Sequence, residues 1–254
     1  MEKIIATNDF INPIGKGYEG IVYNYDNKNV VKVIGNCTLN KVNKIELLNK
    51  LEIDRFIFPD KLVTLENGRP IGYTMKKVET NEFHNLDNIL NSNITLDKKI
   101  KYLKDLEKQL QVAHQNGITL VDLNFTNFLI DQNDDIVAID TDNFTYKELK
   151  TDSFPTLYSF LYRNKVSKTI DENMDKFSFT MKILEYLCYE SILQFDLVNY
   201  HPYRKDLEKF VKKLDIPLNI KTLILHNISN DPNKVYFNNV LDKLSSSKQY
   251  LYKK

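Results

Sequence analysis

Residues 112–144 read VAHQNGITLVDLNFTNFLIDQNDDIVAIDTDNF, and their pattern is the most informative about the fold. The segment begins in the last turns of a long amphipathic stretch, Leu96–Gln115, whose apolar spacing predicts a helix that ends at Asn116-Gly117. Two short apolar runs follow, Phe128–Ile130 and Ile136–Ile139, with a polar turn between them. This order predicts a helix, then a loop, then a β-hairpin.

Three polar side chains lie at the ends of these predicted elements. Asp122 and Asn127 are five residues apart on the loop, and Asp140 directly follows the second apolar run. A hairpin would return Asp140 to the neighbourhood of the loop. Apolar neighbours flank each of these residues, and an unpaired carboxylate is costly to bury. We therefore favour a functional role over the alternative of a simple turn and a strand cap.

The chemistry of phosphoryl transfer needs these residue types. One carboxylate, Asp122, would orient the attacking hydroxyl and accept its proton, while Asn127 and Asp140 would hold Mg²⁺. Mn²⁺ is the alternative ion for the same ligands.

Glycine is concentrated upstream of this segment. Of the 7 glycines, Gly15, Gly17 and Gly20 fall in GKGYEGIV, which ends at Val22 and matches G-x-G-x-x-G-x-V. Glycine lets the backbone approach phosphate closely and direct its N–H groups at it. A strand-like run follows the glycines, whereas a dinucleotide fingerprint requires a helix there. A nucleotide-phosphate loop is therefore favoured over a plain glycine-rich hairpin.

A lysine lies in the next predicted strand. The run Asn29–Ile34 (NVVKVI) contains Lys32, and Asp26-Asn27-Lys28 before it predicts a tight hairpin turn. One hairpin after a glycine loop, Lys32 is a candidate ligand for the α- and β-phosphates of ATP. The following segment predicts a helix with Thr38 as its N-cap, and it offers Glu46 as a partner for Lys32, with Glu52 as the competitor.

The remaining segments complete an α+β pattern. Lys61–Thr64 and Ile71–Met75 predict an antiparallel pair across a turn that contains Asn67-Gly68. Apolar spacing also predicts further helices, at Met174–Gln194, Arg204–Lys213, Leu218–Ser229 and Lys234–Leu244. We expect one two-lobed domain, with a small β-rich lobe containing one helix over 1–78 and a larger, mainly helical lobe over 79–254.

Composition and charge argue against several classes of protein. The 254 residues carry Lys+Arg 35 and Asp+Glu 34, a formal net charge of +1, so electrostatics favour no nucleic-acid partner. The 2 cysteines and 4 histidines show no metal-binding spacing. No segment reads as a signal peptide or a membrane span, and we expect a cytoplasmic protein.

These motifs together resemble those of the protein kinase superfamily, over nearly the whole chain. The resemblance implies a bilobal kinase fold that binds ATP and Mg²⁺. It also implies that Asp122 is the catalytic aspartate, that Asn127 and Asp140 bind the metal, and that Lys32 is the third-strand lysine. Met75, in GYTM, would lie at the approach to the nucleotide-binding hinge. Asp175 is similar to the buried aspartate that begins the central helix of the larger lobe.

The chain also departs from the usual kinase pattern. Leu120-Val121-Asp122 replaces His-Arg-Asp, Asp140-Thr141-Asp142 replaces Asp-Phe-Gly, and Asn124 stands where Ser/Thr kinases usually carry lysine. Without the arginine, activation by a phosphorylated loop residue is not expected. The pattern is most similar to an atypical bacterial or phage Ser/Thr kinase-like branch.

Three functions remain open on this basis. The first is an active protein Ser/Thr kinase, whose partner is a protein with a Ser or Thr hydroxyl. The second is a small-molecule kinase of the aminoglycoside or choline type, whose acceptor is a small alcohol. The third is a nucleotide-binding pseudokinase that serves as a regulatory module.

Overall fold

A computed structural model gives the fold of the chain and describes residues 2–5, 10, 12–17, 19–149, 157–188 and 200–245. Strands and helices are both abundant, so the fold is α+β, as predicted. The chain divides into two compact units. The first unit comprises Met1–Asn85 and Asn127–Asp142, and the second comprises Leu86–Thr126 and Asn143–Lys254.

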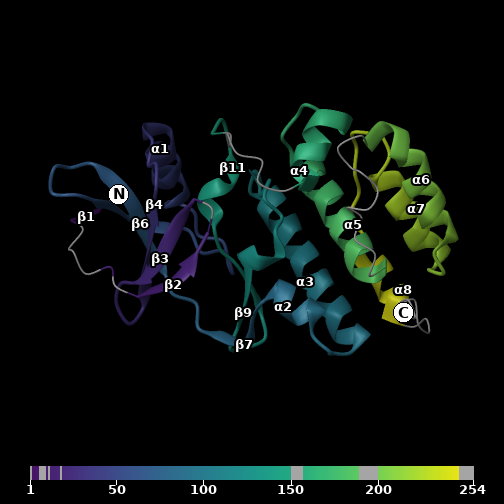
Figure 1. The fold of residues 1–254 in the computed structure, drawn as a ribbon, viewed down its shortest axis with the longest axis horizontal. Coiled ribbons are helices and arrows are strands. Elements are labelled where there is room, and N and C mark those ends of the chain that lie inside the picture. The colour runs from purple at the N-terminus through teal and green to yellow at the C-terminus, as the bar shows by residue number, and fades with distance from the viewer. Residues whose placement is uncertain are drawn as a thin grey trace. The chain divides into compact units, whose positions relative to one another are not determined.

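The first unit is built on a mixed, six-stranded β-sheet. In spatial order its strands are β1 (Lys3–Ile5), β5 (Pro59–Thr64), β6 (Pro70–Lys76), β4 (Asn29–Ile34), β3 (Gly20–Asn24) and β2 (Pro13–Lys16). β1 pairs with β5 in parallel and every other pair is antiparallel. Figure 1 labels all of these strands except β5.

The predicted hairpins of this sheet are confirmed. Between β3 and β4, the Asp26 carboxylate accepts hydrogen bonds from the backbone N–H groups of Lys28 at 2.7 Å and Asn29 at 2.8 Å. Such a side-chain-to-backbone turn is what Asp-Asn-Lys at this place predicts. The β5–β6 pair is also antiparallel, with Leu62 opposite Tyr73.

Only one of the three motif glycines is required by strand packing. A Cβ at Gly20 would lie 2.3 Å from the backbone oxygen of Val33 on β4. At Gly17 the nearest atom would be 3.8 Å away, and at Gly15 it would be 3.7 Å away, both of which are ordinary contacts. Packing therefore explains Gly20 and leaves Gly15 and Gly17 available for another purpose.

We predict that Gly20→Ala destabilises the protein by about 1–3 kcal/mol, because the new methyl group must displace the backbone of β4. Gly17→Ala is the matched control, expected to stay within about 0.5 kcal/mol of wild type. Urea unfolding followed by circular dichroism measures both free energies. Equal stability of the two variants would contradict the assignment.

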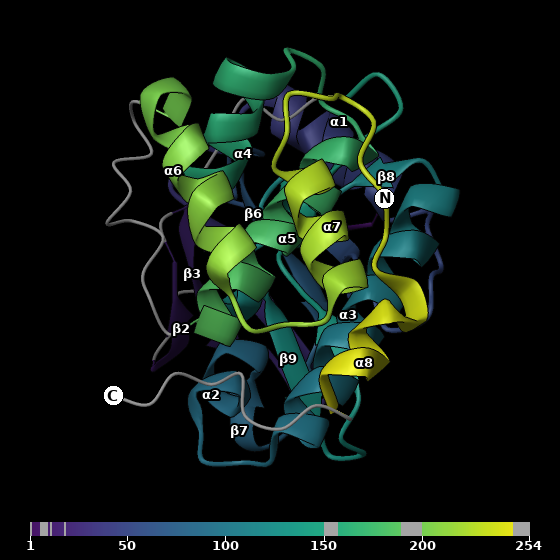
Figure 2. The ribbon, with the colours of Figure 1, turned by 90° about the vertical axis from the view of Figure 1, so that its right-hand side faces the viewer.

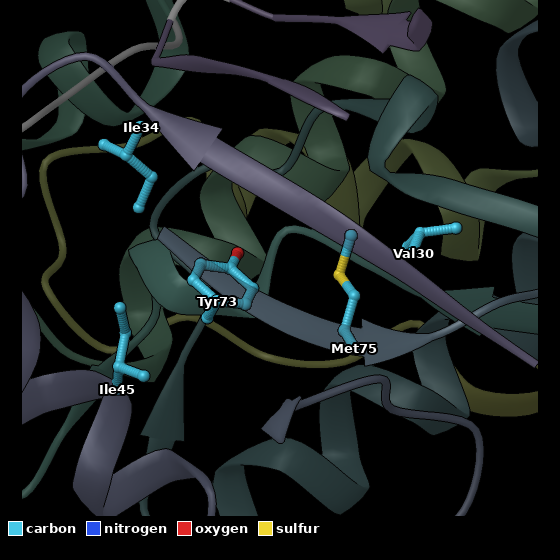
Figure 3. Packing of buried hydrophobic residues seen from close by; sticks show 5 residues of the cluster. All are labelled: Val30, Ile34, Ile45, Tyr73 and Met75. Atoms are coloured by element: carbon cyan, nitrogen blue, oxygen red, sulfur yellow. The ribbon is translucent and has the colours of Figure 1, made fainter. Parts of the chain in front are cut away.

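A hydrophobic cluster fills the space between the sheet and helix α1 (Leu39–Leu48). It consists of Val30, Ile34, Ile45, Tyr73 and Met75 (Figure 3). The helix starts where predicted, since the Thr38 hydroxyl accepts a hydrogen bond from the backbone N–H of Lys41 at 3.2 Å.

A second, three-stranded sheet completes the first unit. Its order is β10 (Ile136–Ala138), β9 (Phe128–Asp131) and β7 (Thr80–Asn85). The predicted β9–β10 hairpin is confirmed, with Val137 opposite Leu129. Arg55 and Ile57 bind the backbone of Ala138 at 2.8 and 2.9 Å, so this hairpin is joined to the segment that follows α1.

The second unit is mainly helical. Its helices are α2 (Leu86–Asn91), α3 (Leu96–Gln115), α4 (Leu157–Leu161), α5 (Glu172–Cys188), α6 (Tyr200–Lys213), α7 (Leu218–Asn227) and α8 (Asp242–Ser245). A short pair, β8 (Ile118–Thr119) and β11 (Thr145–Tyr146), lies among them. α5 contacts both α3 and α7, and α7 also contacts α6 (Figure 2). None of the described helices has the length and apolar character needed to cross a membrane.

The helix predicted at Leu96–Gln115 is confirmed, and Gly117 follows it with a φ of +72°. Those predicted near 174, 204 and 218 are confirmed in place, although residues 189–194 of the first lie outside the described residues.

The helix predicted over Lys234–Leu244 is wrong for its first four residues. There the backbone N–H of Val235 donates to the Asn227 side chain at 3.0 Å, and that of Lys234 donates to Asn173 at 2.9 Å. These tertiary hydrogen bonds replace those of a helix.

Glu107 on α3 is buried in the second unit and accepts a hydrogen bond from the backbone N–H of Phe237. Burial raises the pKa of this carboxyl to about 7, although hydrogen bonds from the backbone of Phe237 and Asn238 oppose the shift. In the unfolded chain a glutamate has a pKa of about 4.3. The folded protein therefore binds this proton more tightly, and this contribution to stability is lost as pH rises from about 4.3 to 7.

We predict that Glu107→Gln removes this pH dependence. The unfolding free energy of the variant, relative to wild type, should increase by about 3 kcal/mol between pH 4.5 and pH 8, because glutamine stays neutral. Denaturant unfolding across this range measures the difference. Glu66→Gln, on an exposed turn, is the control. Parallel profiles for wild type and Glu107→Gln would contradict the prediction.

Candidate active site

Lys32 lies in the middle of β4 with its side chain buried. Val22 on β3 and Tyr73 on β6 are its partners across the sheet. Its ammonium group forms an ion pair with Asp140 and a second one with Asp142 Oδ1 at 2.9 Å. The structure thus brings together two residues predicted from the sequence, Lys32 and Asp140, which are 108 residues apart.

Two hydrogen bonds hold the segment Asp140-Thr141-Asp142 in place. The Ile139 backbone N–H donates to the Asn127 carbonyl at 2.9 Å, and the Thr141 hydroxyl donates to the Ile57 carbonyl at 2.8 Å. Asp140 has a φ of +60°, a left-handed conformation that costs free energy outside glycine and that often marks functional sites. The end of the β9–β10 hairpin is therefore a defined position for these carboxylates.

Asp142 was not predicted as a site residue, yet it is the most buried acid of the group. Its side chain is 0% exposed, and the ammonium group of Lys41 on α1 lies 2.6 Å from its Oδ2. Lys41 also pairs at 3.0 Å with Glu19, which is inside the glycine motif. The signal in the sequence was a second acid two residues after Asp140 in an apolar context, since such an acid needs a buried cation.

The charges of this cluster determine the protonation of its members. Burial alone would lower the pKa of Lys32, but Asp142 and Asp140 outweigh it and raise that pKa. Burial alone would raise the pKa of Asp142, but Lys32 and Lys41 outweigh it and lower that pKa. The pKa of Asp140 is raised, first by burial and then by the charge of Asp142. The pKa values of the two carboxyls are therefore shifted in opposite directions, because Asp142 has two lysine partners and Asp140 has the charge of Asp142 beside it.

The predicted pair between Lys32 and Glu46 does not form among the described residues. Glu46 is half-buried on α1 and Glu52 is exposed after it, whereas Lys32 is bound by Asp140 and Asp142. The physical reason is that α1 contributes the cation Lys41 to this cluster. The acid that a helical glutamate would supply comes instead from the β9–β10 hairpin.

The other predicted nucleotide-binding residues lie on neighbouring strands. Gly15 pairs with Val22, and the backbone N–H of Gly17 donates to the Gly20 carbonyl at 2.9 Å. Val22 packs, partly buried, against the hydrophobic cluster that contains Met75. The glycine-rich turn and these two apolar side chains thus belong to the same sheet as Lys32.

The two predicted metal ligands, Asn127 and Asp140, flank the β9–β10 hairpin. Within the described ranges, no three or more His, Cys, Asp or Glu side chains are grouped to hold a metal ion. Mg²⁺ in kinase-type sites, however, takes only one or two protein carboxylates together with substrate phosphates. Asn127 and Asp140 carry an amide oxygen and a carboxylate, which are donors of this kind.

Asp122 belongs to the second unit, on a loop that a buried aspartate holds in place. Asp175, near the start of α5, accepts hydrogen bonds from the backbone N–H groups of Leu120 at 2.7 Å and Val121 at 2.9 Å. His114 binds the same carboxylate at 2.9 Å. The expectation that Asp175 is buried at the start of this helix is confirmed.

The backbone next to Asp122 is strained. Val121 has a φ of +65°, which is unfavourable for a β-branched residue. The Asp122 N–H donates to the Leu120 carbonyl at 2.7 Å, and the Asp122 carbonyl accepts from the Asn124 N–H at 2.8 Å. Strain of this kind persists only where surrounding contacts impose it. Asp175 provides those contacts and so determines the orientation of the loop at Asp122.

No model of a known protein family matches the sequence, and no curated protein matches it either.

Proposed function

We propose that this chain is an ATP-dependent phosphotransferase with the bilobal organisation of protein kinases, acting on a Ser or Thr hydroxyl of a protein. The observation that carries the proposal is the buried ion pair between Lys32 and Asp140. A cation on a central strand and a carboxylate after a hairpin meet there, in the same sheet as a glycine-rich turn. This is the set of groups that binding of a nucleotide triphosphate with its metal requires.

Each residue has a distinct role in the proposal. Lys32 binds the phosphates of ATP through its ammonium group, and the glycines of the neighbouring turn let the backbone approach the same phosphates. Asn127 and Asp140 hold Mg²⁺, which when bound neutralises charge on the phosphoryl group in transfer. Asp122 orients the acceptor hydroxyl and takes its proton.

The charge of the cluster supports a requirement for metal. Three carboxylates, those of Glu19, Asp140 and Asp142, surround two ammonium groups, those of Lys32 and Lys41. The negative excess disfavours a phosphate that comes without a cation. ATP accompanied by Mg²⁺ suits the cluster better.

The test is transfer of radiolabelled γ-phosphate from ATP by the purified protein, with Mg²⁺ or Mn²⁺. Acceptors are the protein itself, a Ser/Thr-rich protein mixture, and a panel of amino-sugars and amino-alcohols. Transfer to protein hydroxyls is expected. Transfer to the small alcohols alone would replace the protein acceptor by a small-molecule one. ATP binding without any transfer would indicate a pseudokinase.

A further inference from the structure

The cluster around Lys32 extends through a chain of ion pairs to the glycine-rich turn. Lys32 Nζ lies 2.9 Å from Asp142 Oδ1, and Asp142 Oδ2 lies 2.6 Å from Lys41 Nζ. Lys41 Nζ in turn lies 3.0 Å from Glu19 Oε2. A single lysine on α1 therefore contacts both the counter-ion of Lys32 and the turn.

The position of Lys41 is well determined by the fold. It lies in the first turn of α1, and its backbone N–H donates to the capping hydroxyl of Thr38. Its side chain is only 16% exposed. Because Asp142 is fully buried, its two lysine partners compensate its negative charge. If either lysine is removed, the other must compensate that charge alone.

The other end of the chain of ion pairs anchors the turn. Besides the side-chain contact with Lys41, the Glu19 carbonyl accepts a hydrogen bond from the backbone N–H of Gly35 at 3.2 Å. Glu19 therefore ties the turn to the end of β4 through its backbone and to α1 through its carboxylate. Lys41 also neutralises an acid that would otherwise repel phosphate.

We infer that Lys41 is a positioning residue for nucleotide binding, which links the glycine-rich turn to Asp142 and so determines how strongly Asp142 holds Lys32. The inference rests on the proposed function. With Lys41 present, the Asp142 carboxylate is paired with two ammonium groups and therefore binds Lys32 less strongly. The Lys32 ammonium group can then bind the phosphates of ATP. Without Lys41, Asp142 binds Lys32 alone, and the phosphates of ATP compete less well for it.

The experiment is isothermal titration calorimetry, which measures the affinity for ATP in the presence of Mg²⁺. The proteins compared are wild type, Lys41→Met, Glu19→Gln, the double variant and Lys61→Met. Lys61→Met is the matched control, because Lys61 forms a surface ion pair with Glu2 in the same unit. Lys41→Met should weaken ATP binding about tenfold, as loss of a supporting partner does at other sites. The control should stay within about twofold. Circular dichroism checks that each variant is folded, and Lys41→Gln replaces Lys41→Met should the latter not fold.

Two measurements distinguish a positioning role of Lys41 from a role in stability alone. The link predicts that the effect of Glu19→Gln on ATP affinity differs by at least about threefold between the wild-type and Lys41→Met backgrounds, since coupled residues are not additive. In turnover, it predicts that the KM for ATP rises while kcat stays within about threefold.

The outcomes separate the inference from the proposed function. ATP affinity of the Lys41 variant within twofold of wild type overturns the inference and leaves the proposed function standing. The inference is also overturned if Glu19→Gln changes ATP affinity equally in the wild-type and Lys41→Met backgrounds. The same holds if Lys61→Met loses as much ATP affinity as Lys41→Met. Absence of ATP binding by wild type overturns the proposed function, and the inference with it.

Discussion

Asp122→Asn is expected to reduce γ-phosphate transfer by about a thousandfold, because asparagine cannot accept the proton of the attacking hydroxyl. The substitution preserves the volume of the side chain, and the hydrogen bonds that hold the loop reach the backbone of Leu120 and Val121 from Asp175. ATP affinity is therefore expected to remain within about threefold of wild type, since only proton transfer is lost. Radiolabelled transfer and calorimetric titration of ATP measure the two quantities.

The control for this variant is Asp135→Asn. Asp135 pairs with Arg55 at 3.1 Å and has no part in the proposed site. Its loss should leave turnover within about twofold of wild type, because partly exposed ion pairs contribute little. Turnover by Asp122→Asn at the wild-type rate would remove the catalytic role of this aspartate. Equal loss in both variants would indicate a general effect on the protein.

Asp140→Ala is expected to abolish the stimulation of ATP binding by Mg²⁺, a loss of about a hundredfold or more. Even the groups that only support metal ligands are worth 10–100-fold in metal affinity, so a direct ligand should be worth at least as much. The variant also removes one carboxylate from a cluster with a negative excess, and Lys32 keeps Asp142 as its partner. Affinity for ATP without metal should therefore be equal to or higher than that of wild type.

Calorimetric titration of ATP in the presence of Mg²⁺ and in the presence of EDTA tests this expectation. Wild type should bind more tightly with Mg²⁺, and Asp140→Ala should bind equally in both buffers. Asp135→Asn again serves as the control and should keep the wild-type dependence on metal. A dependence on Mg²⁺ that survives in Asp140→Ala would assign the metal to other residues.

The parts of the fold that were predictable from sequence depend on neighbours along the chain. Asp26 forms the turn between β3 and β4, Thr38 begins α1, and Gly117 follows α3 with a positive φ. In each case the signal and the structure are only a few residues apart. Local hydrogen bonds and backbone conformations determine such features, so residue type and spacing are sufficient to predict them.

The helix predicted to begin at Lys234 is wrong at its start because contacts distant in the fold determine the structure there. Apolar spacing there satisfies the helical period, but Asn173 and Asn227 bind backbone groups of this segment from elsewhere in the fold. Such partners are 61 and 8 residues away and carry no local signal. Tertiary hydrogen bonds therefore override the local preference.

The same division applies to the candidate site. Residue types and spacing are enough to predict that Lys32 and Asp140 are polar residues in or beside strands with apolar neighbours, and that the glycines gather before them. Which charges form pairs depends on the three-dimensional packing. It pairs Lys32 with Asp140 and Asp142 in place of Glu46, and it brings Lys41 from α1 to the same acid. The reason is that a buried charge selects its partner by proximity in space, and proximity depends on how helix and hairpin pack on the sheet, which residue spacing along the chain does not encode.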